Sequence, residues 1–163
     1  MTVFQPAAAA YIQQRIAAAC EDGSRTLTLT GNYEIEAPIR LPSDFTLTLD
    51  NCHLRMADGT FCNMLVNEHC RTEEGRTPAG TDRNIRIRGV GKAILDGGEY
   101  NGLSERNSLK DGMPHISHNS LLLFINVDGF SISDLHLRDQ RWWAMNFIYS
   151  RNGHIRNIDF RSN

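Results

Sequence analysis

The sequence lacks the long apolar run that a membrane-spanning helix requires. Such a helix needs about 18 or more consecutive apolar residues, and no run in these 163 residues approaches that length. The first ten residues also lack the basic start of a signal peptide, and polar side chains interrupt the alanine-rich stretch that follows. We therefore expect no membrane partner, with the cytoplasm as the default location and a secreted or periplasmic parent protein as the alternative.

Positive charge is not in excess either. The chain has 17 lysines and arginines against 19 aspartates and glutamates, and its formal net charge is −2. The basic residues are spread along the chain, whereas a nucleic-acid-binding protein concentrates them in a patch or stripe. We therefore expect no nucleic-acid partner.

Paired cysteine motifs are absent as well. None of the four cysteines forms a C-x-x-C pair, and the nearby histidines His53 and His69 follow no metal-binding spacing. We expect no metal and no other cofactor. Buried free thiols are the favoured state, because an unpaired cysteine packs as a small apolar side chain, and one disulfide stays open as an alternative. The cysteines are Cys20, Cys52, Cys62 and Cys70.

One helix is indicated near the start of the chain. Pro6 suits the first turn of a helix, apolar residues recur near the helical period over residues 8–19, and Gly23 suits the C-terminal cap. The predicted helix covers residues 6–22. After it the period changes to two, in short runs rich in β-branched residues that predict strands. Two polar segments, 67–82 and 100–120, are predicted to be exposed loops.

A repeat links the second half of the chain to itself. Residues 132–139 resemble residues 155–162 at an offset of 23 residues, and 84–89 form a looser copy. Asp134 and Asn157 occupy equivalent places between apolar strand residues, where either tolerates a left-handed bend and could stack on the other. Such a period is typical of repeat architectures.

The repeat predicts an all-β fold, a right-handed single-stranded parallel β-helix (a solenoid). We expect one domain over residues 1–163, with a capping helix at 6–22 and the first coils at 26–163. The competing prediction is a β-sandwich with hairpin turns at 101–102 and 152–153, and this leaves the 23-residue recurrence unexplained.

An ordered set of motifs resembles a known family. It comprises the helix, the runs at 27–33 and 39–49, the glycine-rich stretch 89–98, the apolar runs at 121–124 and 130–139, and the pair Trp142 and Trp143. In this order they resemble polygalacturonase-like enzymes of glycoside hydrolase family 28, within the pectin lyase-like superfamily. The resemblance implies a pectin-like polysaccharide as substrate and hydrolysis of galacturonosyl bonds in a parent enzyme.

The catalytic motifs of that family do not appear. The family uses Asn-x-Asp, Asp-Asp, Gly-His-Gly and Arg-x-Lys in that order, and this chain has no Asp-Asp dipeptide. Asn126 and Asp128 match the first motif but come too early, and His154 is followed by isoleucine. We therefore expect no catalytic residue here and an inactive N-terminal portion, truncated before the catalytic coils. An uncapped C-terminal coil of this kind is expected to self-associate.

Five residues are candidates for binding the substrate. Tandem tryptophans can stack on sugar rings, arginine can pair with a uronate carboxylate, and loop histidines can line a cleft. Core packing or simple solvent exposure is the alternative for each. A β-helix polysaccharide lyase fragment and a non-catalytic carbohydrate-binding or assembly module are the alternative functions. The candidates are Arg141, Trp142, Trp143, His115 and His118.

Overall fold

The computed structural model describes residues 2–99 and 102–162. Ten strands and two α-helices follow one another along this part of the chain, with three short 3₁₀ turns at Glu74–Arg76, Pro78–Gly80 and Ile116–Asn119. The helices are α1 (Ala9–Glu21) and α2 (Glu105–Ser108). The strands are β1 (Thr26–Ile35), β2 (Ile39–Leu41), β3 (Thr46–Met56), β4 (Leu65–Asn67), β5 (Asp82–Val90), β6 (Ile94–Asp96), β7 (Leu122–Ile125), β8 (Val127–Arg138), β9 (Met145–Ile148) and β10 (Arg151–Arg161).

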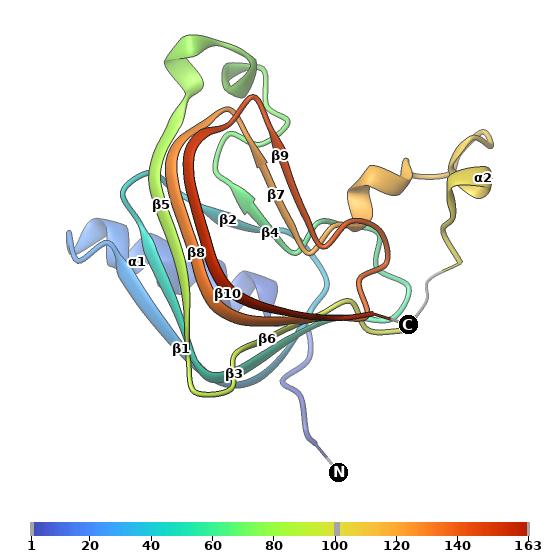
Figure 1. Ribbon diagram of the computed structural model, residues 1–163, viewed down its shortest axis with the longest axis horizontal. Helices are drawn as coiled ribbons and strands as arrows, with labels where there is room; N and C mark the ends of the chain where they lie inside the picture. The colour runs from blue at the N-terminus through green and yellow to red at the C-terminus, as the bar shows by residue number, and fades with distance from the viewer. Residues whose placement is uncertain (1, 100–101, 163) are drawn as a thin grey trace.

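The strands form two parallel sheets (Figure 1). The larger has six strands in the order β1-β3-β5-β8-β10, with β6 placed between β3 and β8, and the smaller has the order β2-β4-β7-β9. Their apolar sides face each other. Leu29, Leu49 and Ile132 of the larger sheet and Leu65 and Phe124 of the smaller one are fully buried in a single core.

Helix α1 lies against the β1 and β2 end of the two sheets. Its buried side chains are Ala9, Ile12, Ile16 and Ala19, which recur at helical spacing and form one apolar face. The side chain of Gln13 fastens the helix to β2, because its amide oxygen accepts from the Arg40 N–H at 2.9 Å and its amide nitrogen donates to the Arg40 carbonyl at 3.1 Å. Helix α1 therefore covers the apolar side chains of the core at the β1 and β2 end of the sheets.

Long strands of the larger sheet bend at residues in the left-handed conformation. Asp134 on β8 has φ +61° and Asn157 on β10 has φ +50°. The Asn157 amide donates to the Asp134 carboxylate at 2.8 Å, and Ile155 pairs with Ile132 at the 23-residue offset of the repeat. The predicted left-handed bend and the predicted stacking of these two side chains are both confirmed.

The predicted fold class is wrong. The structure is an α/β fold with two separate parallel sheets, of six and four strands, accompanied by helices, and it is not the all-β single-stranded solenoid that the repeat suggested. The repeat reports which strands are neighbours. It carries no information on how strands divide between sheets, nor on the helical turns that form in the segments between them.

The two polar segments are more structured than predicted. Residues 67–82 contain two 3₁₀ turns, and their Cys70, Gly75 and Asp82 are buried. The described part of 100–120 contains α2 and a 3₁₀ turn and buries Leu103 and Ile116; residues 100 and 101 lie outside the described residues. A few buried anchors fold these segments onto the sheets, although most of their side chains are polar.

Candidate functional site

Two adjacent hollows lie on the outer side of the larger sheet, away from the core. Their volumes are about 550 and 280 Å³, and they share Lys92, Ile94 and Arg138 as lining residues. We refer to the two together as the outer groove. It runs across the strands from β1 to β10 rather than along any one of them. The other lining residues are Thr2, Phe4, Asn32, Asn51, Cys52, His53, Arg55, Asp96, His136, Leu137, Asp159 and Arg161.

The parallel register builds the floor of the outer groove from two rows of side chains. One row crosses the sheet as Asn32, His53, Ile94, His136 and Asp159, in register on β1, β3, β6, β8 and β10. Side chains in register on neighbouring parallel strands lie about 4.8 Å apart. Contacts between them therefore follow directly from strand pairing. The second row, two residues further along each strand, is Glu34, Arg55, Asp96, Arg138 and Arg161.

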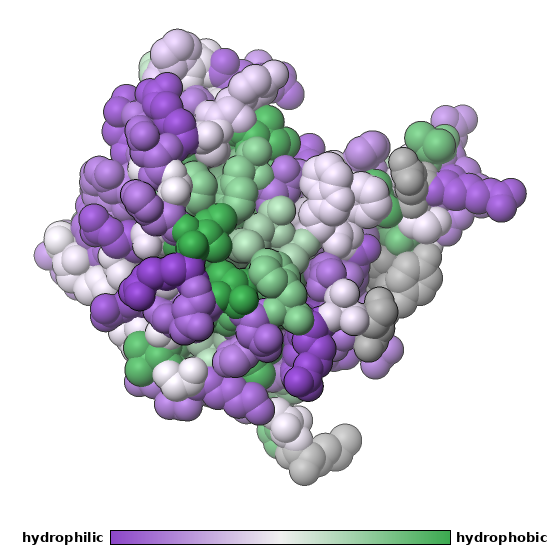
Figure 2. Space-filling model, viewed as in Figure 1, coloured by the Kyte–Doolittle hydropathy of each residue, from purple (hydrophilic) through white to green (hydrophobic). Residues whose placement is uncertain are grey.

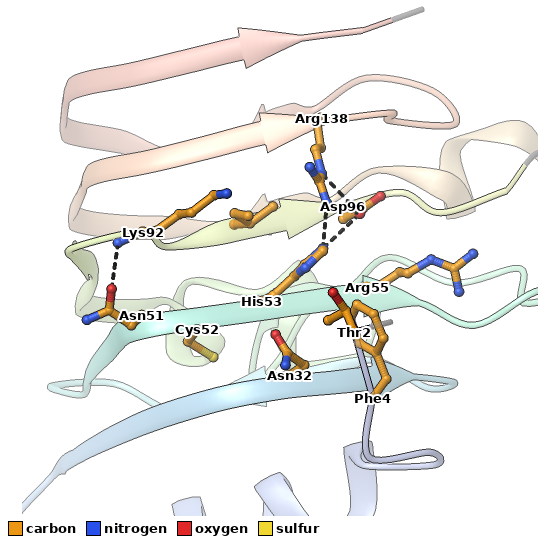
Figure 3. A pocket seen from close by; sticks show the side chains of 11 residues that line it. Thr2, Phe4, Asn32, Asn51, Cys52, His53, Arg55, Lys92, Asp96 and Arg138 are labelled. Carbon is orange, nitrogen blue, oxygen red and sulfur yellow. Dashed lines mark hydrogen bonds and ion pairs between the residues drawn. The ribbon is translucent and has the colours of Figure 1, made fainter.

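Three side chains from different strands meet at the centre of the groove (Figure 3). The Nε2 atom of His53 lies 2.7 Å from Oδ2 of Asp96, and Nε of Arg138 donates to the same oxygen at 3.1 Å. Nη2 of Arg138 also lies 3.2 Å from Nε2 of His53. Nε2 cannot donate to the carboxylate and accept from the guanidinium at once. The shorter contact favours a proton on Nε2 that is donated to Asp96.

The environment keeps Asp96 ionised. Burial by itself raises the pKa of this carboxyl, which is only 5% exposed. Hydrogen bonds from His53 and from the Gly98 N–H, together with the charge of Arg138, outweigh burial and leave the pKa below its ordinary value. A carboxylate held this way orients Arg138, and it is poorly suited to donate a proton to a substrate.

Positive charge is in excess along the outer groove. Four cationic side chains line it, against three carboxylates, those of Asp96 and Asp159 and that of Glu34 in the second row, which pairs with Arg55 at 3.1 Å, although the whole chain carries a formal charge of −2. Within the described residues, no ion pair joins Lys92 or Arg161 to a carboxylate. These two cations are available to an anionic ligand.

A second polar cluster surrounds Asp82 at the start of β5. Its buried carboxylate accepts from the His69 N–H at 3.0 Å and from the Asn67 amide at 2.7 Å, and its other oxygen lies 2.8 Å from Nδ1 of His69. The hydrogen bond to Asp82 raises the pKa of His69, an effect that burial opposes and that the charges of Asp82 and Glu74 reinforce.

Glu68, His69 and Asp82 bring three potential metal ligands within 4.8 Å of one another. Both Asp82 oxygens already accept hydrogen bonds from protein donors, so the contacts of this cluster are accounted for as structural hydrogen bonds. The cluster fixes the segment before β5 to β4.

The predicted binding residue Arg141 has a structural task. Its guanidinium donates to the carbonyls of Thr60 at 2.6 Å and Ala57 at 3.0 Å, and therefore holds the segment that follows β3. Burial lowers the pKa of this guanidinium. Its two terminal nitrogens are engaged by backbone carbonyls, and the binding of a sugar acid by Arg141 stays a prediction.

The two predicted tryptophans lie next to each other between β8 and β9. Their rings are stacked with centroids 5.3 Å apart, and Trp143 is 56% exposed. Stacked, partly exposed indoles are compatible with sugar binding. Their role as a platform stays a prediction.

The two predicted histidines occupy the segment before β7. His115 accepts from the Ser117 N–H through Nδ1 and begins the 3₁₀ turn Ile116–Asn119. His118 lines a separate hollow of about 280 Å³ together with Arg71, and burial lowers its pKa, with the neighbouring positive charge of Arg71 adding to the effect. Of the five predicted residues, only His118 lines one of the hollows described here, and the binding role of the five stays a prediction.

Comparison with known proteins gives no relative: no protein-family model, no curated protein and no solved structure matches the chain. No helix in the described part of the chain combines the length and hydrophobicity needed to cross a bilayer.

Sequence reasoning missed the outer groove. Its central residues are separated by 43 positions between His53 and Asp96 and by 42 between Asp96 and Arg138. The 23-residue repeat pointed to β8 and β10 and, as a looser copy, to β5, but not to β3 or β6. The available signal was the alternation of polar and apolar side chains along the predicted strands, with charged residues at Arg55 and Arg138, and it becomes a row once the register is known.

Proposed function

We propose that the chain binds an anionic polysaccharide along the outer groove, as a substrate-binding part of a pectin-degrading glycoside hydrolase. The observation that carries the proposal is the excess of positive charge in a groove that crosses the larger sheet. From β3 to β10 the groove spans three strand spacings, about 14 Å. This elongated shape suits a linear chain of sugars better than a compact ligand.

The chemistry of the groove favours acidic sugars over neutral ones. Ammonium and guanidinium groups form charge-assisted hydrogen bonds with carboxylates, and Lys92 and Arg161 supply one group of each kind. Asn32, Asn51 and the histidines of the first row offer hydrogen bonds to sugar hydroxyls. The resemblance to polygalacturonase-like enzymes independently suggests a polymer of galacturonic acid.

The proposal assigns binding, not bond cleavage, to these residues. Inverting hydrolysis requires one carboxylic acid that donates a proton and a second carboxylate that activates water. Asp96 has a lowered pKa and two cationic or hydrogen-bonding partners. Asp159 contacts His136 at 3.2 Å. Asp96 therefore holds Arg138 in place, and Asp159 is in contact with His136.

The test is a calorimetric titration of the chain with galacturonic acid oligomers, repeated with fully methyl-esterified oligomers. Binding is expected only for the charged ligand and should weaken as salt is added. Lys92→Glu should reduce the affinity about tenfold or more. Lys110→Glu makes the same charge change on the exposed segment before β7 and should leave it unchanged.

Two results would refute the proposal. One is equal affinity for the charged and esterified oligomers, which would show that the outer groove does not recognise the carboxylates of the ligand. The other is an equal loss in Lys92→Glu and Lys110→Glu, which would show that overall charge, rather than the outer groove, attracts the polymer.

A further inference from the structure

The far end of the two sheets exposes a layer of core residues. Ile155 and Phe160 on β10 are in register with Ile132 and Leu137 on β8, which are 0% and 1% exposed. Ile155 is nevertheless 45% exposed and Phe160 is 56% exposed. Figure 2 shows the apolar surface gathered at the centre of this face, inside the path of β10 and β9 in Figure 1. We call this surface the β10 face.

The backbone of β10 is also open along one side. Among the described residues β10 pairs only with β8, so the opposite edge of this eleven-residue strand presents unpaired N–H and C=O groups. A long edge strand with an adjoining apolar surface is a template for pairing with another strand. From these features we infer that a second copy of this chain covers the β10 face, with β10 of each copy paired antiparallel to β10 of the other.

The bend of β10 fits this arrangement. Asn157 divides the strand into two limbs, 151–156 and 158–161, and Figure 1 shows them running along two sides of the molecule. A two-fold rotation about the line that bisects the bend turns the strand over and exchanges its limbs. The inverted strand then follows the same bent path in the opposite direction. Such an interface is closed, and both copies contribute the same surface.

One register satisfies both the apolar and the polar sides. When the two-fold axis passes between Arg156 and Asn157, Ile155 faces the partner's Ile158 and Gly153 faces the partner's Phe160. On the outer side, His154 faces the partner's Asp159. An apolar side chain thus meets an apolar one at Ile155 and Ile158, Phe160 lies against a glycine that leaves room for its ring, and an aspartate meets a histidine that can donate to it, a favourable cross-strand pair.

The neighbouring registers are disfavoured. An axis through Arg156 sets that residue opposite itself and Arg151 opposite the partner's Arg161, which places like charges together along the strand. An axis through Asn157 sets Ile155 opposite the partner's Asp159 and joins an inward side chain to an outward one. A one-residue slip exchanges the two faces of a strand. The charges and the apolar pattern of β10 therefore both favour the axis between Arg156 and Asn157.

Sedimentation equilibrium on the full chain tests the inference. We expect a reversible dimer of twice the 18.4 kDa chain mass. Ile155→Asp should raise the dimer dissociation constant at least about tenfold, while circular dichroism shows the variant to be folded, because Ile155 is already half exposed in one copy. Val90→Asp, at a residue 46% exposed on β5, is the matched control and should leave the constant unchanged. A monomer at all concentrations, larger assemblies, or equal effects of the two variants would overturn the inference.

The register is tested by cross-linking in a Cys20→Ser background. A chain that carries both His154→Cys and Asp159→Cys should form a disulfide-linked dimer under mild oxidation. His154→Cys alone should not, because it lies five residues from the partner's position 154. Equal cross-linking of both variants would refute the antiparallel register. The sedimentation experiment changes no residue of the outer groove, and although Asp159 lines the groove, cross-linking is read without a ligand, so failure here leaves the proposed function untouched.

Discussion

The two ends of the larger sheet carry the same apolar pattern and meet different surroundings. At one end, Leu27 and Leu29 of β1 are 5% and 0% exposed because α1 and β3 lie on either side of them. At the other end, Ile155 and Phe160 of β10 belong to equivalent rows and are about half exposed. Burial of a residue in this fold therefore depends on the neighbouring layer as much as on its own strand.

The difference shows why α1 is needed. An outer layer of apolar side chains is stabilised only when something removes it from water, at about 25 cal/mol per Å² of apolar surface. The chain supplies an amphipathic helix for β1, and we propose a second copy for β10. The following experiments compare the covered layers with the exposed one.

Thiol labelling should give the largest contrast. Burial raises the pKa of Cys52 on β3 to about 12 and that of Cys62 to about 11, whereas Cys20 at the end of α1 is partly exposed. Since the thiolate is the reactive form, the buried Cys52 at pH 8 should react far more slowly than the accessible Cys20. Mass spectrometry of labelled peptides measures the rates. Similar rates at the two sites in folded protein would contradict a sealed core.

Shortening a side chain should cost much more at the covered end. Ile12→Ala removes a fully buried group from α1 and should lower the free energy of unfolding by about 2–5 kcal/mol. Phe160→Ala, at the exposed end, should cost less than about 1 kcal/mol in dilute protein. Urea denaturation gives both values. Equal losses would mean that the two ends are equally buried in solution.

The bend in β10 should tolerate few residues. Asn157→Val places a β-branched residue at φ +50° and should cost about 1–2 kcal/mol, whereas Asn157→Gly should cost less. Asn146→Val on β9 is the control, since Asn146 is not among the residues with positive φ. Thermal unfolding ranks the three variants. If Asn157→Val proved as stable as Asn157→Gly, the bend would not be left-handed.

The smallest effect concerns pH at the tie between β4 and β5. The pKa of His69 is raised in the folded chain, so its stabilising contribution is full below the unfolded pKa of about 6.5 and is lost as pH rises through the folded pKa. The wild-type advantage over His69→Gln, roughly 0.5 kcal/mol, should therefore be larger at pH 5.5 than at pH 8.5 in urea denaturation. An advantage that grows with pH would reverse the assigned sign.

The local backbone conformation and part of the strand pairing could be predicted from the sequence. Asp134 and Asn157 could be placed at left-handed bends because small polar side chains tolerate that conformation, and the 23-residue offset is the register of β8 and β10. The fold class was wrong because the repeat says nothing of the division into two sheets, nor of helical turns such as Glu74–Arg76.

The candidate site was less accessible to prediction. Arg141, Trp142 and Trp143 attracted notice as an unusual cluster, but Arg141 donates to backbone carbonyls instead. Arg138 and Asp96 are separated by a long segment that pattern analysis could not bridge, and each resembles an ordinary exposed charge on a strand. Only the pairing of β6 with β8 brings them into contact.

Hydrogen–deuterium exchange at two protein concentrations tests the comparison between the two ends most directly. The account predicts that β1 peptides, which are covered by α1, exchange slowly at both concentrations. Peptides covering 151–161 should exchange quickly in dilute protein and become protected in concentrated protein, as β10 pairs with its copy. Equal exchange of β10 at the two concentrations would contradict the account.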